Sequence, residues 1–196
     1  MSLKPLNFRL FAKFEKAETQ TNYVPAKHFF HFVSPNGPFV VQVTEEQFAA
    51  PPTSGSDVWI EGVILTDIDR RKIIRGLYLR LNKIFHANEE FPAPALEEQE
   101  QGGYFDGVCT IKTKPYTTKW GERYQIELGG LGLLYGFSID KPGIYADVPK
   151  NGFPVFIKGR VKMFKENDWK FCYPRLHPTD FEPLPLQRKP SAESIR

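Results

Sequence analysis

The feature that most constrains this 196-residue chain is a period of two, in which apolar and polar residues alternate over many short segments. This alternation predicts β-strands with one buried face, and Gly, Pro, Asn and Asp punctuate the segments as turns do. Five segments lie in the first half of the chain: FRLFAKFEK (8–16), HFFHFV (28–33), FVVQV (39–43), DVWIEGVIL (57–65) and IIRGLYLRL (73–81). Five lie in the second half: GVCTIKTK (107–114), RYQIELG (123–129), LLYGFSI (133–139), PVFIKGRVK (154–162) and WKFCYPRL (169–176). The chain is therefore predicted to be all-β.

A change in composition separates the two halves. Residues 86–102 contain five Glu and no Lys or Arg, although the whole chain has a net charge of +3. The rest of the chain contains 26 basic and 18 acidic residues, so both halves are basic. The stretch also contains two Pro and no apolar alternation, which predicts an exposed linker. The predicted organisation is a domain over 1–87, an acidic linker over 88–102, a domain over 103–182 and a Pro-rich basic tail over 183–196.

The two halves match each other in sequence. VWIEGVIL in the first half aligns with VFIKGRVK in the second, so that Gly62 matches Gly159. A mid-strand glycine predicts a bulge or a sharp bend, which a small barrel needs in order to close. The one helical segment of the first half is TEEQFAA (44–50), with Thr44 as N-cap and Gln47 at the capping-box position. Five short strands with a connection between the third and fourth are typical of the OB fold, so two five-stranded barrels in tandem are expected.

The segment GSDVWIEGVIL also resembles the fourth-strand signature of bacterial-type single-stranded DNA-binding proteins, and GFPVFIKGRVK is a looser copy of it. The resemblance implies an OB fold that binds single-stranded DNA. Such proteins usually carry one fold per chain and assemble as oligomers, whereas this chain carries two matching halves. They also usually end in an acidic tail with an aromatic tip that recruits partners. This chain ends in the basic sequence PLPLQRKPSAESIR, which puts recruitment by that route in doubt.

Residues 112–124, KTKPYTTKWGERY, mix cations and aromatic rings in one loop between the first two strands of the second half. Single-stranded nucleic acid is held by cations along its phosphates and by rings that stack on its bases. In OB folds this loop commonly lines the ligand groove. The predicted binding residues here are Lys112, Lys114, Tyr116, Lys119, Trp120 and Arg123. Tyr124 is in phase with Ile126 and is expected in the core, and the alternative for the whole loop is a solvated hairpin.

A second cluster surrounds a predicted turn at 166–168 between the last two strands. Its predicted binding residues are Lys162, Phe164, Lys165, Trp169 and Lys170. Along the last strand, alternation places Trp169, Phe171, Tyr173 and Arg175 on one face and Cys172 and Leu176 on the other. Periodicity alone leaves open which face is the barrel interior and which is the binding surface.

The first half has a weaker version of the same pattern. Its predicted phosphate-binding residues are Arg70, Arg71 and Lys72 in the loop between the last two strands, with Tyr78 and Arg80 on the following strand. Trp59 and Phe156 occupy equivalent repeat positions, out of phase with their aliphatic neighbours, and are expected to point outward. The two rings could serve in base stacking, in packing between the barrels or in a contact between chains. An interface is the preferred interpretation.

No pattern points to catalysis, a cofactor or a metal. The four His and two Cys lack zinc spacing, no glycine-rich phosphate loop precedes a helix, and no nucleophile–base set is apparent. There is no apolar run long enough for a membrane helix and no secretory signal at the N-terminus. With two Cys and no disulfide framework, a reduced cytoplasmic location is expected.

The predicted function is therefore non-catalytic binding of single-stranded DNA through a basic groove with stacking rings. Single-stranded RNA is the first alternative, because the same rings and cations serve both ligands. A protein-interaction adaptor is the second, with the outward rings and the tail FEPLPLQRKP as docking elements. A second copy of the chain, or a replication or recombination protein, is also open as a partner.

Overall fold

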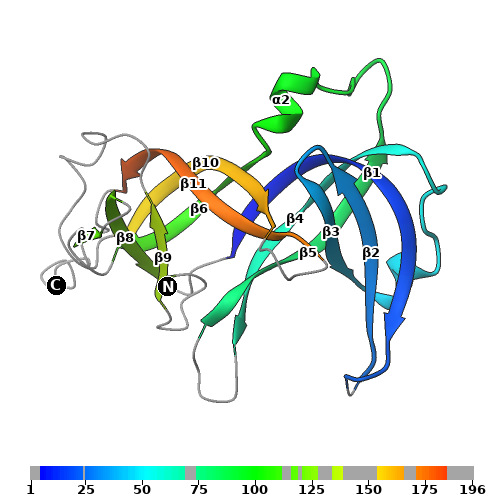
Figure 1. Ribbon diagram of the computed structural model, residues 1–196, viewed down its shortest axis with the longest axis horizontal. Coiled ribbons are helices and arrows are strands. Elements are labelled where there is room, and N and C mark those ends of the chain that lie inside the picture. Colours follow the sequence, from blue (N-terminus) through cyan, green and yellow to red (C-terminus); the bar gives the residue numbers. More distant parts are fainter. Residues whose placement is uncertain are drawn as a thin grey trace, which may run out of the picture.

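The computed structural model describes residues 5–23, 25–68, 74–111, 116–118, 121–127, 134–138, 154–165 and 171–184. Strands dominate it, which confirms the all-β prediction (Figure 1). The strands are β1 (Leu6–Gln20), β2 (Lys27–Ser34), β3 (Gly37–Val43), β4 (Asp57–Ile68), β5 (Ile74–His86), β6 (Gly103–Ile111), β7 (Tyr116–Thr118), β8 (Gly121–Glu127), β9 (Leu134–Ser138), β10 (Pro154–Phe164) and β11 (Tyr173–Pro183). Two short helices, α1 (Glu45–Phe48) and α2 (Leu96–Glu100), complete the described elements.

The first half closes into a five-stranded barrel. Its strands are hydrogen-bonded in the order β1–β2–β3–β5–β4, and β4 pairs back with β1. The β3–β5 pairing is parallel and the others are antiparallel. Helix α1 lies between β3 and β4, where Thr44 and Gln47 form the predicted capping box. This is an OB-like arrangement, and it follows the strand order expected from the sequence.

The second half repeats most of this pairing. Strand β6 pairs with β8 and β10, β8 pairs with β9, and β10 pairs with β11, all antiparallel. The short β7 is an addition that pairs only with β8 among the described strands. The equivalent of the closing β3–β5 pairing would join β9 to β11. It is not among the pairings of the described residues, so the second barrel remains a prediction.

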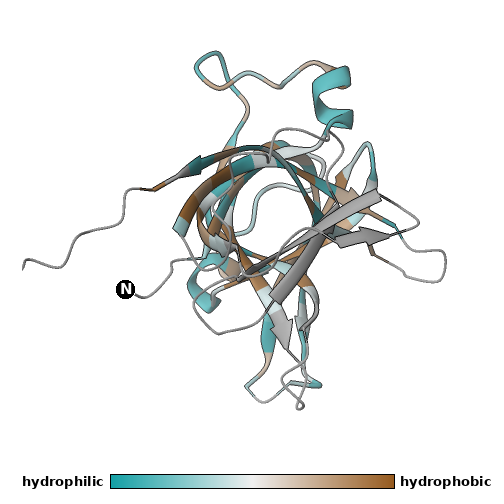
Figure 2. Ribbon diagram, turned by 90° about the vertical axis from the view of Figure 1, so that its left-hand side faces the viewer, coloured by the Kyte–Doolittle hydropathy of each residue, from teal (hydrophilic) through white to brown (hydrophobic). Residues whose placement is uncertain are grey.

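Hydrophobic and hydrophilic residues are mixed along the curved strands, as the brown and teal in Figure 2 show, and burial alternates along β1 and β10. Val58 and Ile60 on β4 are fully buried, as are their repeat equivalents Val155 and Ile157 on β10. The intervening Trp59 and Phe156 are half-buried on the other face, as their phase predicts. The period of two thus identifies the inward residues of both halves.

The two glycines of the repeat lie at matching irregularities. The pairing register shifts between Glu61 and Gly62 in one half and between Lys158 and Gly159 in the other. A Cβ atom on Gly62 would overlap the backbone carbonyl of the partner strand and approach the Phe8 ring to 2.8 Å. At Gly159 it would meet a backbone carbonyl and come within 2.9 Å of Phe105. Both glycines therefore let a partner strand approach closely, and the register shifts agree with the bulges that the sequence predicted.

The halves are joined by β-pairing and share a core. Asn7, Phe8 and Arg9 on β1 pair with residues 104–106 on β6. One cluster of buried side chains includes Leu10 and Phe32 from the first half and Val161 and Leu176 from the second. Separating the halves would break this pairing and expose the shared core. The linker predicted over 88–102 therefore connects two halves that are already in contact through β1 and β6.

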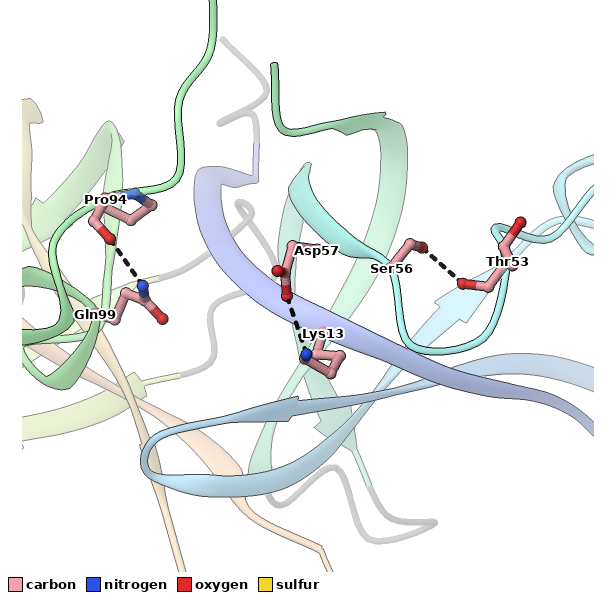
Figure 3. Close-up of polar contacts among 6 residues, drawn as sticks. All are labelled: Lys13, Thr53, Ser56, Asp57, Pro94 and Gln99. Atoms are coloured by element: carbon pink, nitrogen blue, oxygen red, sulfur yellow. Dashed lines mark hydrogen bonds and ion pairs between the residues drawn. The ribbon is translucent and has the colours of Figure 1, made fainter. Parts of the chain in front are cut away.

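The acidic connector is exposed but held in place by hydrogen bonds. Trp59 Nε1 donates to the Pro92 carbonyl at 3.2 Å, and Asn36 Nδ2 donates to the Glu100 carbonyl at 3.4 Å. Gln99 Nε2 donates to the Pro94 carbonyl at 2.8 Å, which closes the connector on itself (Figure 3). In Figure 1, α2 lies at the top of the molecule, on the side opposite the far end of the β1–β2 hairpin. Composition had predicted the exposure but not these contacts.

A second contact between the halves is made by the start of the last hairpin strand. The Cys172 amide donates to the Pro38 carbonyl at 2.8 Å, and Cys172 forms a parallel bridge with Phe39 on β3. The preceding Phe171 packs edge-to-face on the buried His31, with ring centroids 5.1 Å apart. The loop end of the β10–β11 hairpin is thereby fastened to the first barrel.

Thiol chemistry tests this joining of the halves. Cys109 and Cys172 are both buried, and burial raises the pKa of the Cys109 thiol to about 12 and raises the pKa of Cys172 as well. Because a thiolate is the reactive form, neither thiol is expected to react at neutral pH until the whole protein unfolds. Labelling with a thiol reagent in increasing urea checks this. Reaction of Cys172 at urea concentrations where Cys109 is still protected would show that the halves separate independently.

Candidate nucleic-acid interface

The β10–β11 hairpin presents a polar and aromatic outer face. Four residues of this hairpin point into the core: Val161 and Met163 on β10, Cys172 immediately before β11, and Leu176 on β11. The alternate residues therefore point outward: Lys162 and Phe164 on β10, and Tyr173 and Arg175 on β11. This decides the question that periodicity left open, because the face of the last strand that carries Tyr173 and Arg175 is the outer one.

These four outward residues, Lys162, Phe164, Tyr173 and Arg175, form what we call the ring–cation cluster. Phe164 pairs across the hairpin with Tyr173, and Lys162 pairs with Arg175. The Arg175 guanidinium lies 3.5 Å from the Phe164 ring centroid, and its Nη2 donates to the Tyr173 hydroxyl at 2.6 Å. The Phe164 and Tyr173 rings are 5.7 Å apart in an edge-to-face arrangement. Phe164 nevertheless remains 41% exposed, and Lys162 and Arg175 are half-buried, so the ring surface is open to solvent and the cations beside it are partly accessible.

No carboxylate among the described residues balances the charges of the cluster. Lys162 and Arg175 lie directly opposite each other, and like charges in this position are destabilising. Among the described residues, neither has a carboxylate within ion-pair distance. Further along the same hairpin, Lys158 forms a 2.9 Å ion pair with the opposite Asp180. That hydrogen bond raises the pKa of Lys158 and lowers the pKa of Asp180. Among the described residues, the hairpin thus neutralises Lys158 and leaves Lys162 and Arg175 without a carboxylate that would compete with a bound anion.

The second predicted cluster is partly described. Lys162 and Phe164 are members of the ring–cation cluster, and Lys165 is exposed immediately after β10. Trp169 and Lys170 lie outside the described residues. Their predicted roles remain predictions, although both ends of the segment that carries them are fixed, by β10 before it and by the Cys172 contact after it.

Part of the predicted loop at 112–124 also lies outside the described residues, including Lys112, Lys114, Lys119 and Trp120. The backbones of Tyr116 and Arg123 are described and pair directly across the β7–β8 hairpin. The predicted ring residue and the predicted cation therefore occupy paired backbone positions of this hairpin.

In the first half, Arg70, Arg71 and Lys72 lie outside the described residues. Tyr78 and Arg80 on β5 face away from the buried Leu77, Leu79 and Leu81, as predicted, with Arg80 exposed and Tyr78 half-buried. Another ring and cation, Tyr23 and Lys27, lie at the β1–β2 connection. There the Lys27 ammonium lies 4.4 Å from the centroid of the exposed Tyr23 ring.

Trp59 and Phe156, the predicted interface residues, lie on β4 and β10, which do not pair with each other. Trp59 packs edge-to-face on Phe11, with centroids 5.3 Å apart, and is hydrogen-bonded to the connector. It therefore makes a contact within the chain. Phe156 pairs with Val108 on β6 and Glu182 on β11, and its interface role remains a prediction.

Sequence reasoning did not select Arg175 and Tyr173 as binding residues. The available signal was their alternation with Cys172 and Leu176, but this required knowledge of which face is buried. Tyr104 and Arg160 were also missed, because the residues that meet on β6 and β10 are 56 positions apart in the chain.

Within the part of the chain that the structure describes, no three His, Cys, Asp or Glu side chains are grouped so that they could hold a metal ion. No helix in that part is long and apolar enough to cross a membrane.

The fold resembles that of known single-stranded DNA-binding structures. The wild-type single-stranded DNA binding protein from Thermus aquaticus aligns with 100% of both chains at a TM-score of 0.59 and 11% identity. A deletion mutant of that protein covers 98% of this chain and 99% of its own at a TM-score of 0.57 and 13% identity. The Ifi202 HINa domain in complex with double-stranded DNA reaches a TM-score of only 0.29, which is too low to carry an argument. No protein-family model and no curated protein matches the chain. At these identities, the likeness to the Thermus aquaticus protein shows the fold alone.

Proposed function

We propose that this chain binds single-stranded DNA without catalysis, and the observation that carries the proposal is the ring–cation cluster. The cluster combines an exposed Phe164 ring with two cations that have no carboxylate partner among the described residues. Cations beside stackable rings are what single-stranded nucleic acid requires of a protein surface. The OB-like fold and its likeness to single-stranded DNA-binding structures support the same conclusion.

In this mechanism the phosphates contact Lys162 and Arg175 while bases stack on Phe164. Arg175 is packed on one ring and hydrogen-bonded to another, so little of its freedom remains to be lost when a phosphate binds. Trp120, Tyr116 and Trp169 would extend the stacking surface, and Lys112, Lys114, Lys119, Arg123, Lys165 and Lys170 would extend the phosphate contacts. In the first half, Arg70, Arg71, Lys72, Tyr78 and Arg80 would form a weaker continuation.

The second half would complete its own barrel through a pairing of β9 with β11. The pairings already made by β6, β8, β9, β10 and β11 match those of the first barrel, and the matching glycine irregularities support a duplicated unit. The rings and cations do not distinguish DNA from RNA. Our preference for DNA comes from the resemblance of the Trp59 segment to bacterial-type single-stranded DNA-binding proteins and from the structural likeness above.

Intrinsic fluorescence tests the proposal, because the chain has three Trp and two of them lie in predicted binding loops. Oligo-dT is expected to quench Trp120 and Trp169, and the affinity is expected to fall steeply with salt as counterions are displaced. Replacing both by Ala should weaken binding at least tenfold, since stacking contributes roughly 1–3 kcal/mol per base. Duplex DNA and oligo-U serve as the comparison ligands.

The third tryptophan provides a matched control. Trp59 is half-buried and hydrogen-bonded to the connector, so its fluorescence should not respond to the ligand. In a Trp59→Phe variant the quenching by oligo-dT should be retained. Failure of any oligonucleotide to bind, by fluorescence and by a label on the oligonucleotide, would refute the proposal and favour the adaptor alternative. Equal affinity for oligo-U would remove the preference for DNA.

A further inference from the structure

A row of outward side chains crosses the sheet where the two halves join. Arg160 on β10 lies opposite Tyr104 on β6, Tyr104 lies opposite Arg9 on β1, and Arg9 lies opposite Glu61 on β4. Arg9 forms an ion pair with Glu61, whereas Arg160 has no carboxylate at ion-pair distance among the described residues. The row therefore contains an aromatic ring between two guanidinium groups, one of them neutralised.

The Tyr104 ring is held rigidly and is still accessible. The Arg160 guanidinium stacks 3.8 Å from the centroid of the Tyr104 ring. The Tyr104 hydroxyl donates a hydrogen bond to a Glu98 carboxylate oxygen at 2.5 Å. This hydrogen bond to an anion raises the pKa of Tyr104, so the hydroxyl stays protonated at neutral pH. Tyr104 is nevertheless 43% exposed. An exposed ring that is already oriented can stack on a base with little loss of conformational entropy.

Tyr104 forms one wall of a groove between the halves. The groove encloses about 520 Å³ and is also lined by Asn7, Arg9, Asn82 and Asp106. This volume is within the range of small-ligand sites. Asn7 and Asp106 are hydrogen-bonded to each other at 3.1 Å, and Asn82 is exposed. The groove thus offers donors and acceptors for the edge of a base beside a ring that can stack on its face.

The groove lies in line with the ring–cation cluster. Arg160, Lys162 and Phe164 are alternate residues of β10, so they share its outer face. The four steps along the strand from Phe164 to Arg160 span about 13 Å at the strand rise of roughly 3.3 Å per residue. Lys162 lies between them and has no carboxylate partner among the described residues. Cations therefore continue without interruption along β10 from the cluster to Tyr104.

We propose that Tyr104, Arg160 and the groove beside them form a second stacking site for the same single strand of DNA, which runs from the ring–cation cluster along β10 to the junction of the halves. The inference rests on the proposed function. Tyr104 stacks on a base that enters the groove, and Arg160 contacts the adjoining phosphate. The path crosses from the second half onto β1 of the first, so the two halves make one continuous site.

Titration of variants of the 196-residue chain with oligo-dT tests this inference. The oligonucleotide has about 16 nucleotides, the upper site size for one OB fold. Tyr104→Leu should weaken binding roughly tenfold, whereas Tyr104→Phe, which keeps the ring and loses the hydroxyl, should bind as the parent does. Arg160→Gln should lower the slope of log affinity against log salt by about 0.7, the value for one phosphate on a single strand. Lys158→Gln is the matched control on the same strand, because Lys158 is already paired with Asp180, and it should change neither quantity.

The outcomes separate the inference from the proposed function. If Phe164→Ala weakens binding while Tyr104→Leu does not, the strand binds at the cluster alone and the second site is refuted. If Tyr104→Phe weakens binding as much as Tyr104→Leu, the hydrogen bond to Glu98 matters instead of stacking, and the inference also fails. If the parent protein does not bind oligo-dT, both proposals fall. Preferential binding of oligo-U would show that the ligand along β10 is RNA, and the assignment to DNA would be wrong.

Discussion

Replacing Gly62 by Ala is expected to lower the free energy of unfolding by about 3 kcal/mol, at the upper end of the usual cost of overpacking a core. The added methyl group would overlap the Arg80 carbonyl of the neighbouring strand and lie 2.8 Å from the Phe8 ring. A backbone carbonyl in a strand cannot swing aside as the end of a flexible side chain can. The β4–β5 pairing would therefore have to open at the point where its register shifts.

Gly76→Ala provides the matched control for this prediction. It makes the same chemical change on β5, but a Cβ at Gly76 would meet nothing within 4 Å. Its effect should stay within about 0.5 kcal/mol, as for other unobstructed surface sites. Urea denaturation followed by circular dichroism measures both variants, and the Gly62 variant should shift the midpoint without changing the slope. Equal stabilities for the two variants would mean that β4 and β5 are farther apart than described.

Gly159→Ala extends the test to the other half, where the methyl group would lie 2.7 Å from the Pro178 Cα atom and 2.9 Å from the Phe105 ring. Because the halves share a core, the whole chain should unfold in a single transition, and this variant should shift the midpoint of that transition to a lower urea concentration. A separate, early transition confined to the second half would contradict the joining of the halves.

The parts of the fold that sequence predicted depend on local patterns. The burial of Val58, Ile60, Val155 and Ile157 follows from the period of two, and the capping box at Thr44 follows from the spacing of two polar residues. These features are encoded within a few positions. They do not depend on which distant strand lies alongside.

The joining of the halves could not be predicted in the same way. The β1–β6 pairing is made by backbone groups of residues almost a hundred positions apart, and alternation says nothing about which strand edges meet. The contacts of the connector could not be predicted for a related reason. Its Pro and Glu content predicted exposure correctly, but the carbonyls of Pro92 and Glu100 accept hydrogen bonds from the first barrel, and composition does not report on backbone contacts.

The ring–cation cluster could be predicted only in part. Alternation grouped Tyr173 with Arg175 and placed Cys172 and Leu176 on the opposite face, but both faces contained apolar side chains. The inward face is decided by what packs against it. The Cys172 amide donates a hydrogen bond to β3 of the first barrel, and Leu176 packs in the core that the two halves share. Both contacts exist only because the halves are joined, which the sequence did not predict.

Replacing Arg175 by Ala is expected to weaken the binding of oligo-dT by about 2 kcal/mol, or roughly 30-fold in Kd, within the range for charge-assisted hydrogen bonds. The variant loses a phosphate contact and also the packing that orients Phe164 and Tyr173. Titration at several salt concentrations separates the two effects. The slope of log affinity against log salt should fall by about 0.7 in Arg175→Ala, the value for one lost phosphate contact.

Arg175→Lys distinguishes charge from geometry. Lysine keeps the positive charge but lacks the planar guanidinium that stacks on Phe164 and hydrogen-bonds to the Tyr173 hydroxyl. Its salt slope should therefore match that of the parent, while its affinity should fall by about 1 kcal/mol, the usual magnitude for a stacked cation. Full affinity in Arg175→Lys would show that the charge alone suffices. An unchanged salt slope in Arg175→Ala would show that the phosphates of the bound strand do not reach the cluster, and the proposed path along β10 would then be wrong from its first contact.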